Sequence, residues 1–125
     1  MIILPQAPSS VVMIRPHHFS PNEQTAADNS FQSVNANVGG ELTALAFEQV
    51  TMAAEKLAKA GITVHLFEDE TTLTPDSVFP NNWFSTHSGG QIAIYPMYAE
   101  NRRLERRADI IEMLKAQYRV QDVLD

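Results

Sequence analysis

A long amphipathic segment between two short apolar runs constrains the fold of this chain most strongly. Residues 41–60 carry apolar side chains at spacings of three and four, which predicts a helix, and Gly61 follows as its C-cap. The run 62–67 (ITVHLF) comes next and is rich in β-branched and aromatic residues, which predicts a strand. With the apolar run 11–14 (VVMI) as a first strand, the sequence predicts a β-α-β unit whose two strands are parallel.

The C-terminal half adds a hairpin, a helix and a last strand. Residues 83–86 and 91–95 have strand composition, and Gly89 and Gly90 between them supply the backbone of an antiparallel hairpin turn. The segment 101–118 is predicted to be one continuous second helix, with one apolar face made of Leu104, Ala108, Ile111, Leu114 and Tyr118. Residues 120–124 again favour a strand.

The connection between the first strand and the first helix is polar. Residues 16–40 are rich in Asn, Ser and Gln and contain Pro21, which predicts a long loop with a short helical turn near 25–31. At 125 residues and 44% hydrophobic, the chain suits one modest α/β domain or part of one.

The composition of the chain limits the kinds of binding partner that we expect. The net charge of −6 opposes capture by nucleic acid or an anionic membrane, so we expect a small-molecule partner. The apolar start of the chain is cut by Pro5 and Pro8, which fits neither a signal peptide nor a membrane span and favours a cytoplasmic location. Four arginines between residues 102 and 107 lie among acids, which favours a solvated helix face for Arg106 and Arg107.

Several kinds of catalytic centre have no support in the sequence. The chain contains no cysteine, which excludes disulfides, thiolate metal sites and a cysteine nucleophile within these residues. The histidines lack the spacing of metal ligands, and no serine lies in a Gly-x-Ser-x-Gly turn. We therefore expect neither a metal nor a cofactor.

The segment 74–87 (TPDSVFPNNWFSTH) places two amides directly before aromatic strand residues, although Asn is a poor strand former. One interpretation is structural: Pro80 followed by Asn81 and Asn82 is good turn chemistry, and Phe79 fills a core. The other is that the amides contact a ligand and Phe79 forms a wall beside it.

A resemblance to a known family favours the interpretation that the two amides and Phe79 contact a ligand. TPDSVFPNNW resembles the substrate-binding segment of the guanidine-modifying (pentein) superfamily, where dimethylarginine dimethylaminohydrolases read Pro-Asp-x-Val-Phe-x-Glu-Asp. Asp76 and Phe79 match that pattern, whereas Asn81 and Asn82 stand in place of its two acids. Residues 101–105 (NRRLE) resemble the Arg-Arg-x-Glu run of the same family, and residues 11–32 are most similar to the start of citrulline utilisation hydrolases, an amidinotransferase-like branch.

The resemblance implies a partial α/β propeller of the pentein fold. Five ββαβ modules surround an axis in that fold, and residues 1–125 would form the first one and a half to two of them, the N-terminal part of a single catalytic domain with no complete second domain. The implied reaction is hydrolysis of a C–N bond, in which a cysteine thiolate attacks the guanidino or ureido carbon and a histidine protonates the leaving nitrogen. Both groups belong to later modules, so this chain alone is expected to be inactive.

The resemblance also assigns substrate-binding roles. Asp76, Asn81 and Asn82 would bind the headgroup, Phe79 would line its aliphatic chain, and Arg102 would hold its carboxylate. A guanidinium only donates hydrogen bonds, while an amide both donates and accepts, so the two asparagines favour a neutral ureido group and point toward citrulline. Citrulline or an arginine derivative as substrate, and a hydrolase or a transferase as enzyme, both stay open.

Two non-enzymatic alternatives remain. The chain could be a binding module for arginine-like or citrulline-like ligands, which tight binding by the isolated chain would reveal. It could instead be an assembly module, because an unfinished propeller exposes sheet edges and apolar surface that favour self-association.

Overall fold

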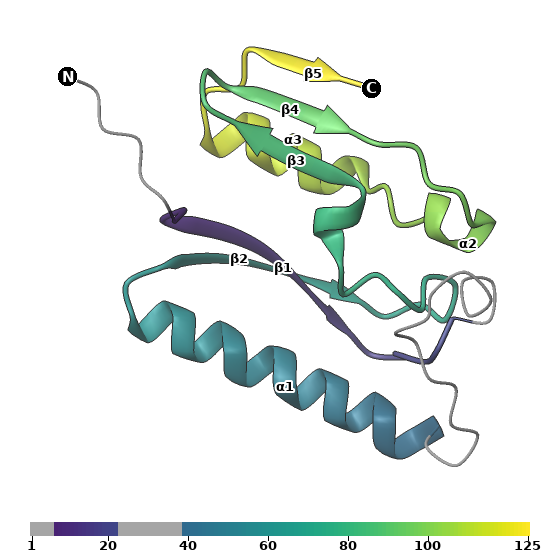
Figure 1. The fold of residues 1–125 in the computed structure, drawn as a ribbon. Helices are drawn as coiled ribbons and strands as arrows, with labels where there is room; N and C mark the ends of the chain where they lie inside the picture. Colours follow the sequence, from purple (N-terminus) through teal and green to yellow (C-terminus); the bar gives the residue numbers. More distant parts are fainter. Residues whose placement is uncertain (1–6, 23–38) are drawn as a thin grey trace.

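The computed structural model describes residues 7–22 and 39–125, which form a mixed α/β structure with two sheets (Figure 1). Strand β1 (Ser10–Pro16) pairs in parallel with β2 (Thr63–Asp69) along its whole length, and helix α1 (Gly39–Lys59) covers one face of the pair. The predicted β-α-β unit is therefore confirmed. The helical turn predicted near residues 25–31 lies outside the described residues.

Helix α1 ends where the sequence places its glycine. Gly61 has a φ of 91°, and its N–H donates to the carbonyl of Ala58 at 3.0 Å. The N–H of Ile62 donates to the carbonyl of Leu57 at 3.0 Å, which completes a Schellman motif. This reversal sends the chain straight back into β2, alongside β1.

The second sheet has the order β3-β4-β5. Strands β3 (Phe84–His87) and β4 (Gln91–Ile94) form the predicted antiparallel hairpin, and β5 (Asp122–Leu124) pairs in parallel with β4. Gly90 lies at the turn with a φ of 78°, and a Cβ atom there would lie 2.4 Å from the carbonyl oxygen of Arg119. Only glycine therefore lets the segment before β5 approach the hairpin this closely.

The prediction of one continuous helix over residues 101–118 is wrong. The structure has a single turn, α2 (Glu100–Arg103), and a separate helix α3 (Ala108–Gln117). Arg107 has extended backbone angles at the start of α3, which interrupts the helical hydrogen bonding. Leu104 is consequently 60% exposed, whereas the periodicity placed it on the buried face.

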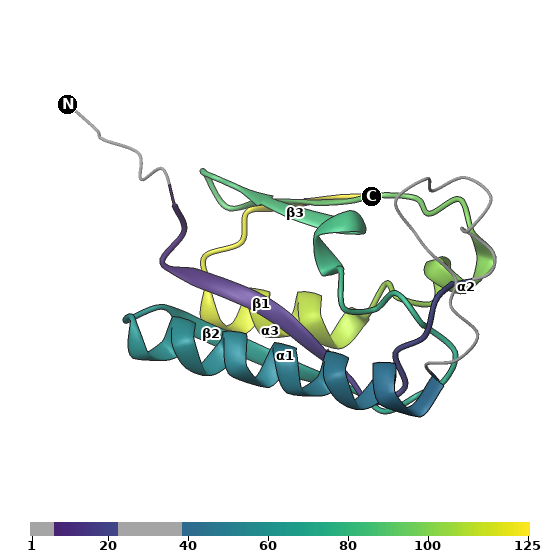
Figure 2. The same cartoon turned by 60° about the horizontal axis from the view of Figure 1, so that its bottom comes forward.

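The core lies between β1, the second sheet and α3. Figure 2 shows the β3-β4-β5 sheet as one layer, and β1, β2, α1 and α3 all lie on the same side of that sheet. The core side chains come from β1, β3, β4, α3 and the residue before β3, namely Ile14, Trp83, Phe84, Ile92, Ile110, Ile111 and Leu114. Among the described residues, none of the helices is both long and apolar enough to cross a lipid bilayer.

The broken helix can be tested by comparing two apolar residues. Ile110 is 0% exposed, so Ile110→Ala removes packed methyl groups from the core. We expect it to lower the free energy of unfolding by about 2–5 kcal/mol, measured by urea denaturation. Leu104→Ala is the matched control and should change that free energy by less than about 0.5 kcal/mol. A large loss for Leu104→Ala would mean that the single long helix is correct.

Candidate functional site

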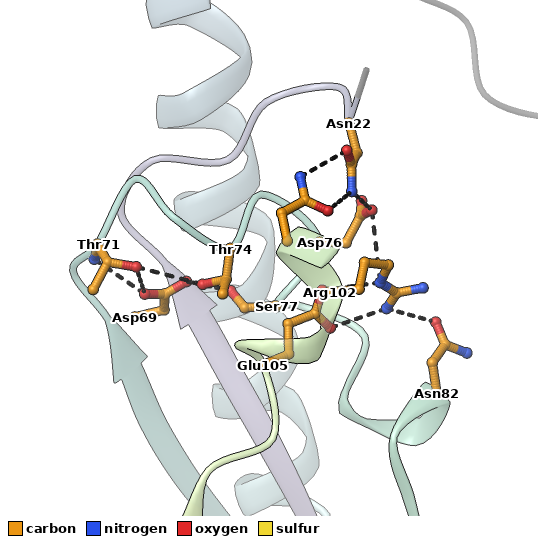
Figure 3. A network of polar contacts seen from close by, with 10 residues as sticks. Asn22, Asp69, Thr71, Thr74, Asp76, Ser77, Asn82, Arg102 and Glu105 are labelled. Atoms are coloured by element: carbon orange, nitrogen blue, oxygen red, sulfur yellow. Dashed lines mark hydrogen bonds and ion pairs between the residues drawn. The ribbon is translucent and has the colours of Figure 1, made fainter. Parts of the chain in front are cut away.

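The loop that leaves β2 is organised around Asp69, the last residue of that strand. Its carboxylate accepts hydrogen bonds from the N–H and hydroxyl of Thr71 at 3.0 and 2.8 Å, and from the hydroxyls of Thr74 and Ser77 at 2.7 and 2.5 Å (Figure 3). Asp69, Thr74 and Ser77 are all buried. Because Asp76 directly precedes Ser77, this set of hydrogen bonds also fixes the backbone that carries the predicted site residue.

These hydrogen bonds set the ionisation of Asp69. Burial acts to raise the pKa of its carboxyl group, but the hydrogen bonds from Ser77, Thr74 and Thr71 outweigh it and leave the pKa below its ordinary value of 3.8. Asp69 is therefore a carboxylate at neutral pH, and its charge is compensated by donors rather than by a cation.

A buried ion pair joins Arg102 of α2 to Glu105. The Nε and Nη2 atoms of Arg102 donate to the two carboxylate oxygens of Glu105 at 2.9 and 3.0 Å. The side chain of Glu105 is 0% exposed. Burial raises the pKa of Glu105, Arg102 opposes that rise, and the neighbouring charges of Asp76 and Asp69 add to it. For Arg102, burial acts to lower the pKa, but Glu105 and Asp76 together raise it, which keeps the guanidinium charged.

Arg102 also joins the two predicted site segments. Its Nε atom lies 3.8 Å from Oδ2 of Asp76, and its Nη2 atom donates to Oδ1 of Asn82 at 3.0 Å. Asn82 ends the short 3₁₀ turn η1 (Pro80–Asn82) that follows the Asp76 loop. We call Asp76, Asn82, Arg102 and Glu105 the Arg102 cluster, which Figure 3 shows as one connected network.

A pair of amides supports Asp76 from the other side. Nδ2 of Asn22 donates to Oδ2 of Asp76 at 2.8 Å and to Oδ1 of Asn101 at 3.0 Å. Nδ2 of Asn101 donates back to Oδ1 of Asn22 at 2.9 Å. Three parts of the chain therefore meet at Asn22: the segment that follows β1, the loop that follows β2, and helix α2.

The structure brings some predicted site residues together and separates others. Asp76, Asn82 and Arg102 share the Arg102 cluster. Asn81 is exposed and borders a different feature, a cavity of about 750 Å³ between the two sheets, which does not reach the other three residues. Phe79 is 44% exposed beside η1, which excludes the interpretation of this residue as core filler.

Sequence reasoning missed the residues that hold the cluster in place. Glu105 is one of the acids that lie among the arginines, and its place in the Arg-Arg-x-Glu run is the signal that could have found it. Asn22 lies in a polar segment without periodicity, and Asn101 begins the segment predicted as a helix, where no local pattern distinguishes it. Asp69 ends an apolar strand before a run of threonines, a pattern that indicates a capped turn.

The other arginines of this segment have partners of their own. Arg106 pairs with Asp125, and Arg107 pairs with Asp109 and donates to the backbone carbonyl of Glu68. These contacts agree with the interpretation of the arginine run as a charge-balanced face. Within residues 7–22 and 39–125, no three His, Cys, Asp or Glu side chains gather as a metal site would require.

Comparison with known proteins identifies the class of protein. Residues 15–125 match the family model described as N,N dimethylarginine dimethylhydrolase, eukaryotic. The match covers most of the chain, including Asp76, Asn82 and Arg102, and the chain belongs to this family. It confirms the resemblance to the dimethylaminohydrolases read from the sequence. A search of curated proteins and a search of solved structures each gave no match.

The role of Asp69 predicts a pH dependence. Because its folded-state pKa lies below 3.8, the stabilisation is complete well above that pH and is lost as the pH falls through the folded-state pKa. We expect Asp69→Asn to lower the free energy of unfolding by about 1.5–3 kcal/mol at neutral pH, with this difference shrinking below about pH 4. Urea denaturation across this pH range measures it.

The control for Asp69→Asn is Asp122→Asn, which makes the same change at an exposed position of β5. It should alter the free energy of unfolding by less than about 0.5 kcal/mol at every pH. A loss for Asp69→Asn that stays constant down to acid pH would contradict the assignment of an ionised, hydrogen-bonded carboxylate.

Proposed function

We propose that this chain is the N-terminal, substrate-orienting part of a hydrolase that acts on the guanidino or ureido carbon of an arginine-like amino acid. One observation carries the proposal: Asp76, Asn82 and Arg102, which stand at the substrate-binding positions of the family pattern, lie in one hydrogen-bonded and ion-paired cluster. Membership of a family named for dimethylarginine hydrolysis supports the substrate class.

The chemistry divides between this chain and residues outside it. Hydrolysis of this kind needs a thiolate to attack the planar carbon and an acid to protonate the leaving nitrogen. The sequence contains no cysteine, so we assign the thiolate, and with it the general-acid histidine, to further modules of a pentein-type propeller. In this proposal residues 1–125 form the N-terminal part of one catalytic domain and contribute orientation, which by itself lowers the barrier once the nucleophile is present.

The orientation of the Asn82 amide indicates which substrate headgroup it could bind. A guanidinium has only donors, so the atom of Asn82 that faces Arg102 must be its oxygen. The NH₂ group of Asn82 then lies on the side away from Arg102, as Figure 3 shows. This NH₂ group suits an acceptor such as a ureido oxygen, and it would meet only further donors on a methylated guanidinium. The arrangement supports citrulline as substrate, through Asn82 alone and without Asn81.

Arg102 is the residue that we propose binds the carboxylate of the substrate. Its Nε and Nη2 atoms are engaged by Glu105 and Asn82, and within the described residues no group accepts a hydrogen bond from Nη1. In the proposal Nη1 donates to the carboxylate of the amino acid, and the exposed ring of Phe79 packs against its aliphatic chain. The remaining parts of the proposal are a cytoplasmic location, no cofactor, and self-association through exposed apolar residues such as Leu124.

The first prediction from this proposal is that the chain is catalytically inert. Incubation with L-citrulline should release no ammonia, and incubation with N,N-dimethyl-L-arginine should release no dimethylamine, because the attacking sulfur is missing. A colorimetric ammonia assay and chromatography of amines measure these products. Turnover above the buffer blank would refute the assignment of the nucleophile to residues outside this chain.

The second prediction concerns binding. A partly built site should bind L-citrulline weakly, with a Kd of about 1 mM or higher, and NMR titration should shift the backbone amides of Asp76, Asn82 and Arg102. Arg102→Lys keeps the charge but loses the planar fork, so we expect binding to weaken about tenfold or more.

Arg106→Lys is the matched control, because Arg106 pairs with Asp125 outside the Arg102 cluster. It should leave the titration unchanged. Micromolar binding by the isolated chain would instead favour the non-catalytic binding module.

A further inference from the structure

Asn22 occupies a position that the proposed function does not use. It lies just after β1, is 1% exposed, and contacts both the Asp76 loop and α2. Both protons of its amide nitrogen are engaged, one by Oδ2 of Asp76 at 2.8 Å and one by Oδ1 of Asn101 at 3.0 Å. A buried amide with this many defined partners is fixed in orientation as well as in place.

Asp76 requires Asn22 to face it with the amide nitrogen. Asn22 and Asn101 exchange hydrogen bonds in both directions, so the pair alone would be equally satisfied if both amides were turned over. A carboxylate only accepts, and a turned Asn22 would present its oxygen to Oδ2 of Asp76. Asn22 therefore donates to Asp76, and Asn101 holds it in that orientation.

The hydrogen bond from Asn22 makes the two carboxylate oxygens of Asp76 inequivalent. Oδ2 accepts from Asn22 and is also the oxygen that faces Nε of Arg102, at 3.8 Å. Within the described residues, nothing donates a hydrogen bond to Oδ1. A distance of 3.8 Å is longer than a hydrogen bond, so Asp76 and Arg102 form a loose ion pair without a direct hydrogen bond.

We propose that Asn22 is a positioning residue for Asp76. By holding Oδ2, it keeps the carboxylate from swinging onto Arg102 and leaves Oδ1 as the acceptor offered to the headgroup of the ligand. This inference rests on the proposed function, because it takes Asp76 to be a substrate-binding group. Without the donor at position 22, Asp76 closes onto Nε of Arg102, and its carboxylate is lost to the headgroup of the ligand.

The test compares two variants that make the same chemical change. Asn22→Asp removes the donor to Asp76 and sets a second carboxylate against it. Asn101→Asp keeps an acceptor for Nδ2 of Asn22, so Asn22 still donates to Asp76, while one bond of the amide pair is broken. Both variants add one negative charge and both should lower the urea midpoint. Binding is then measured in the 125-residue chain, labelled with ¹³C and ¹⁵N, by NMR titration with L-citrulline and with N,N-dimethyl-L-arginine.

The expected result separates binding from stability. Ligand should shift the side-chain carboxyl ¹³C resonance of Asp76 in the wild type and in Asn101→Asp. In Asn22→Asp that resonance should be displaced before ligand is added and should not respond, with a Kd at least about tenfold weaker.

Three outcomes would overturn the inference, and they differ in what else they remove. Unchanged binding by Asn22→Asp would refute the positioning role and leave the proposed function intact. Equal loss of binding in both variants would reduce Asn22 to a structural residue. Absence of any shift at Asp76, Asn82 and Arg102 with either ligand in the wild type would remove the proposed function and the inference together.

Discussion

The buried carboxylate of Glu105 is the constraint on which the rest of the site depends. A charge that is fully removed from water must be paired and hydrogen-bonded, or it destabilises the fold by several kcal/mol. Arg102 meets this requirement with two parallel hydrogen bonds, three residues earlier in the chain. Once held, the guanidinium has a fixed plane, and its position relative to Asp76 and Asn82 follows.

The site is built from segments that are far apart in the sequence, each held by a different polar group. Asp69 fixes the loop that carries Asp76 through hydroxyl donors, and its charge needs no cation. Asn22, in the segment after β1, donates a hydrogen bond to the carboxylate of Asp76. The parallel pairing of β1 and β2 makes this convergence possible, because it places the C-terminal ends of both strands at the same edge, Pro16 opposite Asp69.

Local patterns predicted the elements whose stability is local. The β-α-β unit and the hairpin followed from apolar periodicity and from glycines that the structure finds at positive φ. The helix break was not predictable in this way, because periodicity counts apolar residues and Leu104 fits the pattern while being exposed. Periodicity also does not predict that Glu105, a charged side chain, is buried against Arg102. Asp76 and Arg102 were found through a resemblance to a family pattern, whereas Asn22 was missed because its partners lie 54 and 79 positions away. Asn81 resembles Asn82 in sequence, but only Asn82 faces Arg102.

The most direct test of this account is a double-mutant cycle on the buried pair, with the free energy of unfolding measured by urea denaturation. Arg102→Gln should lower it by about 3–5 kcal/mol, because it leaves the fully buried carboxylate of Glu105 without its partner. Glu105→Gln should lower it by less, because the partly exposed Arg102 keeps its contacts with Asp76 and Asn82. The double variant should lose less than the sum, by about 1–3 kcal/mol, because it removes both charges together. Losses that add to within about 0.5 kcal/mol would show that the two residues are independent, and the account of how the site is assembled would be wrong.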